Sequence, residues 1–178
     1  MKKTFTLAFL LTALVFTGYS QSNYSVLTNR VLFSVLVNND TLIVENTKNR
    51  VRLNGEMGLL EIIYYNQDAR VVGSDFGRKL ESDITFRFWN EYSWLEEYLK
   101  SDLPVITFTD ELNIDISGEE ETIQANFTVT RIRGSQGFTS MLEIQGDFSP
   151  EPLKADFPNL MFRKDLHFKI FLTIQVLN

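Results

Sequence analysis

The sequence has no cysteine and a single histidine, His167. The missing thiol excludes disulfide bonds, thiolate metal sites, thiol catalysis, covalent haem attachment and the acylated cysteine of a lipoprotein. One histidine leaves carboxylates as the only abundant metal ligands. The acidic run at residues 117–121, "SGEEE", lacks the D-x-D-x-D-G spacing of a calcium loop and is expected at a hairpin tip. We therefore expect no metal and no cofactor.

Catalytic motifs are missing as well. Neither the G-x-S-x-G of a hydrolase nucleophile nor a glycine-rich phosphate loop occurs. His167 lies between two apolar residues of an alternating run, so it is expected to face solvent. Asp110 interrupts an apolar row, and no second acid stands out as its partner for a glycosidase pair. We predict that a bulge turns Asp110 outward, in preference to a buried pairing with an arginine, and that the protein is not an enzyme.

Long hydrophobic runs are limited to one stretch, residues 7–16, which is too short to span a bilayer comfortably. It follows Lys2 and Lys3 and precedes small residues, a pattern typical of a secretory signal peptide. We predict cleavage after about Ser20. The mature domain would then cover residues 21–178, contain no integral membrane span, and be periplasmic or secreted.

Positive charge is scarce. The formal net charge is −6 at pH 7, and loss of the two leader lysines shifts it to −8. An acidic exported domain is a poor candidate for binding nucleic acid or an anionic membrane surface, and we expect no nucleic-acid partner. Since disulfides are excluded, the fold must depend on hydrophobic burial, for which fifteen phenylalanines are available.

What the sequence does have is a period of two. Apolar and polar residues alternate along residues 31–37, 41–45, 84–89, 105–117, 122–132 and 166–177. Asn38, Asn39 and Asp40 join the first two of these runs in a tight hairpin. Several runs reach about eleven residues, and long strands with one apolar face fit a sheet that closes on itself and so removes its exposed edges. We predict an all-β fold, an antiparallel lipocalin-like β-barrel of about eight strands.

One short segment has a helical period instead, with apolar residues at Trp94, Leu95, Tyr98 and Leu99. Ser93 is the expected N-cap, and the helix is predicted to run for about two turns across one mouth of the barrel. Trp89, Tyr92, Trp94 and Tyr98 either pack this helix on the barrel end or stack on a ligand such as a sugar. Residues 66–82 are predicted to be a long loop, and residues 146–162 an irregular connection with a helical turn.

The apolar rows predict the lining of the barrel interior. These candidate ligand-binding residues are Phe86, Phe88, Phe127, Val129, Leu142, Ile144, Phe168, Ile170 and Leu172. Such a lining can bury an alkyl chain, with about 0.8 kcal/mol for each methylene removed from water. The same residues, interdigitated more tightly, would fill the barrel and leave no room for a ligand. The sequence does not distinguish these two cases.

The stretch "RIRGSQG", residues 131–137, contains two arginines and two glycines. Gly134 and Gly137 supply the backbone freedom of a hairpin turn. Arg131 continues the apolar row of the preceding strand to the rim, where it would pair with an acid or a ligand head group, and is the tenth candidate ligand-binding residue. Arg133 points the same way only if no bulge intervenes. Our preferred interpretation of this stretch is a turn between two strands, and the second is a contact with an anion at the rim.

The order of these elements resembles the second half of the YceI-like family of exported proteins. Pro104, Ile106, Thr107 and Phe108 match the family's "yPtitF" strand. Thr128, Thr130, Ile132, Arg133 and Gly134 match its "ltirGvtkpv" strand end. The resemblance covers residues 84–148 and implies a lipocalin-style barrel that holds a long isoprenoid or fatty-acid-like chain in an apolar lumen.

Two functions of different classes follow. The first is an exported, non-enzymatic barrel that binds or carries an apolar, lipid-like molecule. The alternative is a packed-core structural or interaction module of the bacterial envelope without a small-molecule ligand. An outer-membrane barrel is a third reading, against which the internal helix and the proline-rich connection argue.

Overall fold

The computed structural model describes residues 24–37, 40–72, 84–133, 138–149, 151–153 and 165–176. The predicted leader with its cleavage site, the hairpin residues Asn38 and Asn39, and the two glycines of "RIRGSQG" lie outside these ranges. The fold below is therefore that of the expected mature domain.

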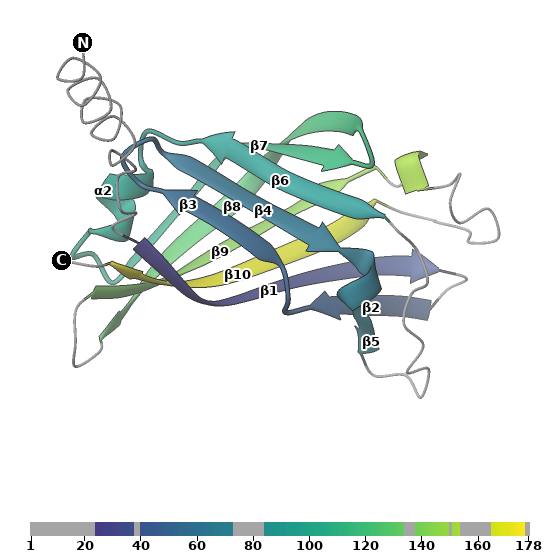
Figure 1. Cartoon of the computed structure of the whole chain (residues 1–178), viewed down its shortest axis with the longest axis horizontal. Coiled ribbons are helices and arrows are strands. Elements are labelled where there is room, and N and C mark those ends of the chain that lie inside the picture. The colour runs from purple at the N-terminus through teal and green to yellow at the C-terminus, as the bar shows by residue number, and fades with distance from the viewer. Residues whose placement is uncertain are drawn as a thin grey trace, which may run out of the picture.

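The alternating runs form ten antiparallel strands in one sheet (Figure 1). The strands are β1 (Tyr24–Val37), β2 (Asp40–Asn46), β3 (Arg50–Asn54), β4 (Leu59–Tyr65), β5 (Arg70–Val72), β6 (Thr85–Glu91), β7 (Val105–Ile116), β8 (Glu119–Arg133), β9 (Phe138–Phe148) and β10 (Leu166–Val176). Their order across the sheet is β3-β4-β6-β7-β8-β9-β10-β1-β2-β5. The predicted all-β, antiparallel, lipocalin-like class is confirmed, with ten strands rather than about eight.

The sheet curls into a half-barrel in which its two ends face one another. Figure 1 shows β3, β4 and β6 crossing in front of β8, β9 and β10, so that the concave faces enclose the interior. The long strands carry this curvature, because the right-handed twist accumulates along and between them. The helix α2 (Leu95–Leu99) lies at one end.

Two hairpins form as the sequence indicates. Strand β1 pairs with β2 up to Val37 opposite Asp40, which leaves two residues for the loop. Strands β7 and β8 are joined by Ser117 (φ 52°) and Gly118 (φ 99°), the positive values that a tight two-residue turn needs. Asp115 Oδ1 accepts a hydrogen bond from the Gly118 amide at 2.7 Å. The "SGEEE" run is therefore a solvated hairpin tip.

The predicted loop at residues 66–82 is wrong in its first half. It contains a 3-10 turn, Asn66–Asp68, and the three-residue strand β5, which pairs with β2. Three residues are too few for alternation to become visible in a sequence. The helical turn expected in the proline-rich connection is present as Glu151–Leu153.

The helix α2 is shorter than expected and begins differently. It has five residues, its N-cap is Trp94, and no side chain caps it, so the prediction of Ser93 as N-cap is wrong. The Leu95 amide bonds to the Tyr92 carbonyl at 3.2 Å, which means that the chain is already turning before the helix begins. Burial of Leu95 and Leu99 against the barrel end, rather than capping, stabilises this single turn.

A glycine makes the close approach between the β3–β4 turn and the start of the α2 segment. Gly58 has φ +70°, and its carbonyl accepts a hydrogen bond from the Tyr92 amide at 2.9 Å. A Cβ atom at Gly58 would lie 2.3 Å from the Tyr92 carbonyl oxygen. Gly118 also has a positive φ, but a Cβ there would meet nothing within 4 Å.

We expect Gly58→Ala to lower the free energy of unfolding by about 2 kcal/mol or more, because backbone strain and a backbone clash add. Gly118→Ala is the matched control and should lose only about 1 kcal/mol from strain. Urea denaturation of both variants measures the difference. Equal losses would show that the approach of Gly58 to Tyr92 does not constrain the fold.

Candidate functional site

The nine apolar residues predicted to line the interior all face it and are all buried, none more than 5% exposed. They come from β6, β8, β9 and β10. The register sets Phe127 opposite Ile144 on β9, and Ile144 opposite Ile170 on β10. Val129, Leu142 and Leu172 form the next row in the same way. The structure therefore brings them into one apolar wall, and their contact with a ligand stays a prediction.

Aromatic rings fill the middle of the described interior. They belong to Phe33, Tyr64, Phe86, Phe88, Phe148 and Phe168. The centroids of Phe33 and Phe86 are 4.7 Å apart, and those of Phe88 and Phe168 are 5.1 Å apart across the barrel. Burial raises the pKa of Tyr64, whose hydroxyl donates to Asn66 Oδ1 at 3.2 Å.

Sequence reasoning missed three of these rings. Phe33 stands in the alternating run of β1, so its period did carry a signal. Tyr64 lies in "LLEIIYY", where apolar residues on both faces hide the alternation. Phe148 ends β9 next to the proline-rich connection, where the strand end itself was uncertain.

A second aromatic group closes the end of the barrel beneath α2. Trp94 packs against Phe108 at 4.5 Å and against Phe127 at 5.3 Å between centroids, and Tyr98 stacks on Trp94 at 5.6 Å. Tyr92 contacts the same group. These three of the four candidate stacking aromatics pack the helix onto the barrel. Trp89 is separate: it lies under the Arg87 guanidinium, 4.9 Å from the ring centroid.

Asp110 does not sit on a bulge, so the preferred prediction for this residue is wrong. The pairing of β7 with β8 runs without a register shift from Val105 to Ile116. Asp110 keeps its place in the inward row and finds a partner there: its Oδ2 accepts a hydrogen bond from the Trp94 indole nitrogen at 2.8 Å. The partner is an indole rather than an arginine, and this bond fixes Trp94 over the barrel end.

Arg131 lies at the same end, as predicted, and pairs with an acid. Its guanidinium donates to the Ser101 carbonyl at 3.1 Å and forms an ion pair with Asp102. Because Asp102 is 93% exposed, this ion pair adds little stability. Arg131 thus ties the connection after α2 to β8, and contact with a ligand head group stays a prediction. Strands β8 and β9 pair as far as Arg133 opposite Phe138, so "RIRGSQG" does join two neighbouring strands.

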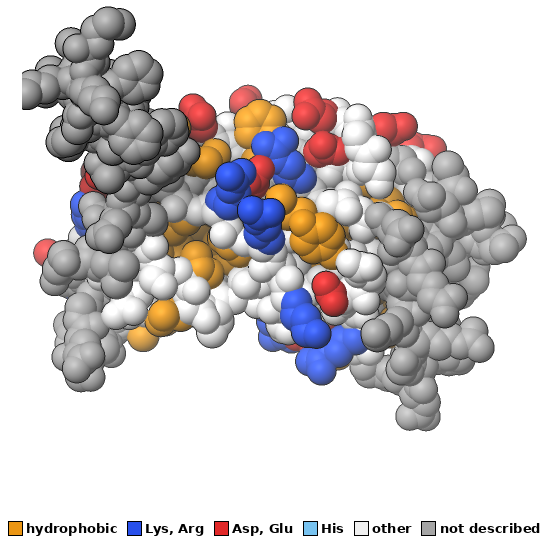
Figure 2. All heavy atoms as spheres, viewed as in Figure 1, with side chains coloured by type: hydrophobic (Ala, Val, Ile, Leu, Met, Phe, Trp, Pro, Cys, Tyr) orange, Lys and Arg blue, Asp and Glu red, His pale blue; other side chains and the backbone are white. Residues whose placement is uncertain are grey.

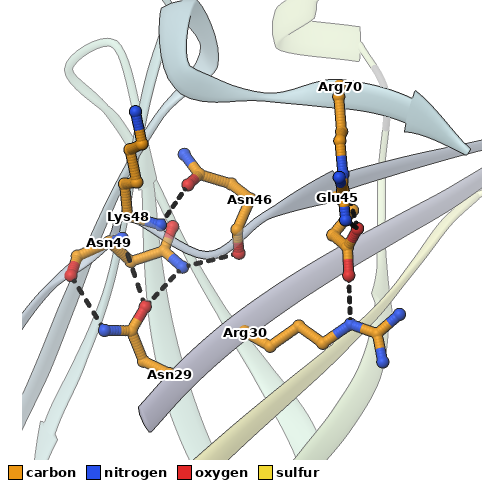
Figure 3. Close-up of polar contacts among 7 residues, drawn as sticks. All are labelled: Asn29, Arg30, Glu45, Asn46, Lys48, Asn49 and Arg70. Atoms are coloured by element: carbon orange, nitrogen blue, oxygen red, sulfur yellow. Dashed lines mark hydrogen bonds and ion pairs between the residues drawn. The ribbon is translucent and has the colours of Figure 1, made fainter.

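The line where the curled sheet meets itself is joined by side chains. Residues 24–30 of β1 pair with β10 on one side, and on the other side they face β3, to which the described strands show no backbone pairing. Asn29 on β1 contacts Asn49, the residue before β3, across this gap, and Asn49 also contacts Asn46 within the β2–β3 turn (Figure 3). Asn46 in turn contacts Tyr65 at the end of β4. We call this line, from Tyr24 and Gly55 through Asn29 and Asn49 to Asn46 and Tyr65, the seam.

The asparagine amides reproduce part of a strand ladder. Asn29 Nδ2 donates to the Asn49 carbonyl and Asn29 Oδ1 accepts from the Asn49 amide, both at 3.2 Å. Asn49 Nδ2 donates to Asn29 Oδ1 and to the Asn46 carbonyl, both at 2.9 Å. Asn46 Nδ2 donates to the Tyr65 carbonyl at 2.8 Å. Each bond contributes about 1 kcal/mol net, so the seam is closed by less than a continuous backbone ladder would give.

Two buried glutamates flank the seam on the outer face of the sheet. Glu45 on β2 is held by Arg30 at 2.5 Å and by Arg70 at 2.6 Å (Figure 3). Glu61 on β4 is held in the same manner by Arg52 at 3.1 Å and Arg87 at 2.7 Å. Both carboxylates are about 6% exposed, so each needs its arginines to offset the loss of water.

The arginines set the protonation of these two acids. The hydrogen bond from Arg70, with the charge of Arg30, holds the pKa of Glu45 below its ordinary value. Burial acts to raise the pKa of Glu61, but the hydrogen bonds from Arg87 and Arg52 outweigh burial and leave the pKa lowered. Both groups are therefore charged at neutral pH.

A groove of about 600 Å³ lies on the outer face beside the seam. A bulge between Val26 and Thr28 pushes Leu27 out, where it is 53% exposed. Leu27, Met141 and Phe171 give the groove apolar walls, and Asn29 and Arg30 line the side nearest the seam. This groove could not be predicted from the sequence, because one extra residue in a strand has no signature in the alternation of β1.

The described residues contain no group of three or more His, Cys, Asp and Glu side chains that could hold a metal ion. His167 is 38% exposed, as expected, and its Nδ1 lies 3.0 Å from Asp147 on the outer face. Within the same residues, no helix has the length and hydropathy needed to cross a membrane.

Comparison with known proteins reveals a likeness in structure only. No family model matches the sequence, and no curated protein matches it. A polyisoprenoid-binding domain from Saccharophagus degradans, implicated in plant cell wall breakdown, matches with a TM-score of 0.63. The match covers 88% of this chain and 99% of that one at 10% sequence identity. The likeness shows the lipocalin-like fold, and the neighbour is a binding domain.

The glutamate ion pairs make stability depend on pH. A carboxylate with a lowered folded pKa contributes stability above its ordinary pKa of 4.5, and this contribution is lost as the pH falls through the lower, folded value. We expect Glu61→Gln to be less stable than the wild type at neutral pH and to lose less stability on acidification below about pH 4.5. Thermal unfolding from pH 7 to pH 3 measures this. Glu119→Gln, at the solvated hairpin tip, is the control, and parallel pH profiles for Glu61→Gln and wild type would contradict the assignment.

Proposed function

We propose that this protein is an exported, non-enzymatic carrier of an apolar, lipid-like molecule, isoprenoid or fatty-acid-like, which it holds in the interior of the half-barrel. We further propose that it belongs with the YceI-like proteins as a divergent member. The signal peptide, removed after about Ser20, would deliver the mature domain to the periplasm or the exterior.

The observation that carries this proposal is the unbroken apolar wall. Its nine inward side chains come from β6, β8, β9 and β10 and carry no charge. Strand β7, between β6 and β8, adds the buried Leu112, Ile114 and Ile116, and its inward Asp110 lies, like Arg131, at the α2 end. A chain of methylenes laid along such a wall gains about 0.8 kcal/mol for each group removed from water. The fold shared with a polyisoprenoid-binding domain supports the same class of ligand.

The seam supplies the room that such a ligand needs. The described rings in the middle of the interior are in contact, so a chain laid between these rings requires the sheet to widen there. A backbone ladder resists widening along its whole length, whereas the seam is held by the amides of Asn29, Asn46 and Asn49. Opening at the seam would uncover the inner wall while the pairing from β4 through β6 to β1 stays intact.

The second candidate function is an interaction module of the envelope with a permanently packed interior. The observation that favours it is the ring packing itself: Phe33, Phe86 and Phe88 lie within 6.5 Å of one another, centroid to centroid. Such close packing is typical of a solid core, which needs no ligand.

Native mass spectrometry separates the two functions. The mature protein is purified from the envelope fraction of its own source, and bound material is extracted into organic solvent. We expect a chain that begins near Gln21 and carries a discrete added mass of alkyl or isoprenoid character. A ligand-free mass, together with no uptake of oleic acid or a polyprenol in vitro, would contradict the carrier function and favour the packed module.

We expect Ile170→Trp, which enlarges a fully buried side chain of the inner wall, to reduce uptake of oleic acid at least tenfold. Ile132→Trp makes the same change at a residue that is 40% exposed on the outer face of β8, and should leave uptake unchanged. Native mass spectrometry measures the uptake of oleic acid by both variants, because this readout does not depend on tryptophan fluorescence. Near-ultraviolet circular dichroism confirms folding, and Val129→Leu serves as a milder second variant. Equal uptake by a folded Ile170→Trp variant would place the ligand elsewhere.

A further inference from the structure

The outer face on both sides of the seam is rich in arginine. Arg52 on β3 and Arg87 on β6 hold Glu61 on β4, and Arg50 lies two residues before Arg52 on the same face of β3. Arg30 on β1 and Arg70 on β5 hold Glu45 on β2. Figure 2 shows these as two groups of basic side chains on one face of the molecule. We call the five arginines and two glutamates the arginine face. Asp115 on β7, opposite Arg87, borders this face, so five positive charges stand against three negative ones and leave it positive.

A group of acids lies at the β7–β8 hairpin tip, which carries Glu119, Glu120 and Glu121. Asp115 lies at the end of β7, opposite Arg87 on β6, and so borders the arginine face. Figure 2 shows acidic side chains along the upper edge of the molecule. The net charge of −6 is thus an average over two unlike regions. The expectation that an acidic domain is a poor candidate for an anionic membrane surface rests on the net charge of the whole chain and stays a prediction. A face on which basic residues are collected, however, has its own local potential.

The arginines keep donors free for a partner. A guanidinium has five N–H groups, and Arg52 and Arg87 each give Glu61 one hydrogen bond. The Arg52 and Arg70 side chains are 61% and 75% exposed although they are paired. Arg50 makes no ion pair within the described residues and is exposed. The glutamates therefore hold the arginines in position without covering them.

Apolar side chains accompany the charges. Ile43 and Val72 lie opposite one another on β2 and β5, two positions from the Glu45–Arg70 pair, and are 37% and 41% exposed. The groove with Leu27 and Phe171 shares Arg30 with the arginine face. Guanidinium groups beside exposed apolar side chains suit a surface that has anionic head groups above hydrocarbon, as an anionic bilayer has.

We propose that the arginine face docks on the surface of a bilayer that contains anionic phospholipids. Phosphate groups would receive the free guanidinium N–H groups, and Ile43, Val72 and Leu27 would reach the boundary of the acyl chains. Docking there turns the asparagine seam and the adjoining groove toward the lipid. One part of this proposal rests on the proposed carrier function: if the protein carries an apolar chain, the bilayer is the source or the destination of that chain.

Vesicle flotation tests the proposal with the mature protein. We expect flotation with vesicles of phosphatidylcholine and phosphatidylglycerol at about 0.1 M salt and its loss at about 1 M salt, where screening is strong. No flotation is expected with phosphatidylcholine alone. Arg50→Glu should weaken the partition coefficient about twentyfold, because it removes two units of charge difference at the surface. Lys100→Glu, the same reversal on α2 at the barrel end, should change it by less than about threefold.

Three results would overturn the docking proposal: absence of flotation with anionic vesicles, equal losses for Arg50→Glu and Lys100→Glu, and binding to heparin beads without binding to vesicles. The last would assign the arginine face to a soluble polyanion. Mass spectrometry of the same samples keeps the proposed function separate. Flotation by a protein that never takes up a chain supports docking and contradicts the carrier, and a bound chain without flotation does the reverse.

Discussion

The structure depends on how a ten-stranded sheet is closed. Its outer strands leave a gap between the first half of β1 and β3, and the described strands do not bridge it with backbone hydrogen bonds. Asn29 and Asn49 join β1 to the residue before β3 instead, and Asn46 joins β2 to the end of β4 at Tyr65. Along this line the described strands are joined by side chains rather than by a backbone ladder, and the apolar interior lies behind it.

The side chains inside the half-barrel and the ion pairs on its outer face are both related to how the sheet is closed at the seam. Inside, an apolar wall and packed rings supply most of the stability, as they must in a chain without disulfides. Outside, the strands that border the seam carry Glu45 and Glu61, each buried beneath two arginines. These ion pairs cross from strand to strand, so they hold β1 to β5 and β3 to β6 together as two firm margins. Because these ion pairs hold the strands on each side of the seam together, we expect the sheet to open along the seam rather than within either group of strands.

Much of this could be predicted from alternation alone. The long strands, the all-β class and the nine wall residues all follow from a period of two, because a strand with one apolar face can bury it in only one way. Features that depend on where one residue lies in the folded structure could not be predicted in this way. No periodic pattern in the sequence predicts the hydrogen bond between Trp94 and Asp110, the three-residue strand β5 or the bulge at Leu27. The seam is of this kind too: Asn29 and Asn49 are twenty residues apart, and ordinary asparagines read as loop formers.

Hydrogen–deuterium exchange of the mature protein tests the seam most directly. The comparison is between the slowest amides of β3, those bonded to β4, and the slowest amides of β8 and β9 in the centre of the sheet. We expect the β3 amides to exchange through a local opening, well before the central strands, whose protection reports global unfolding. Equal protection of β3 and of the β8–β9 pair would contradict a weak seam, and with it the route by which a chain is proposed to reach the interior.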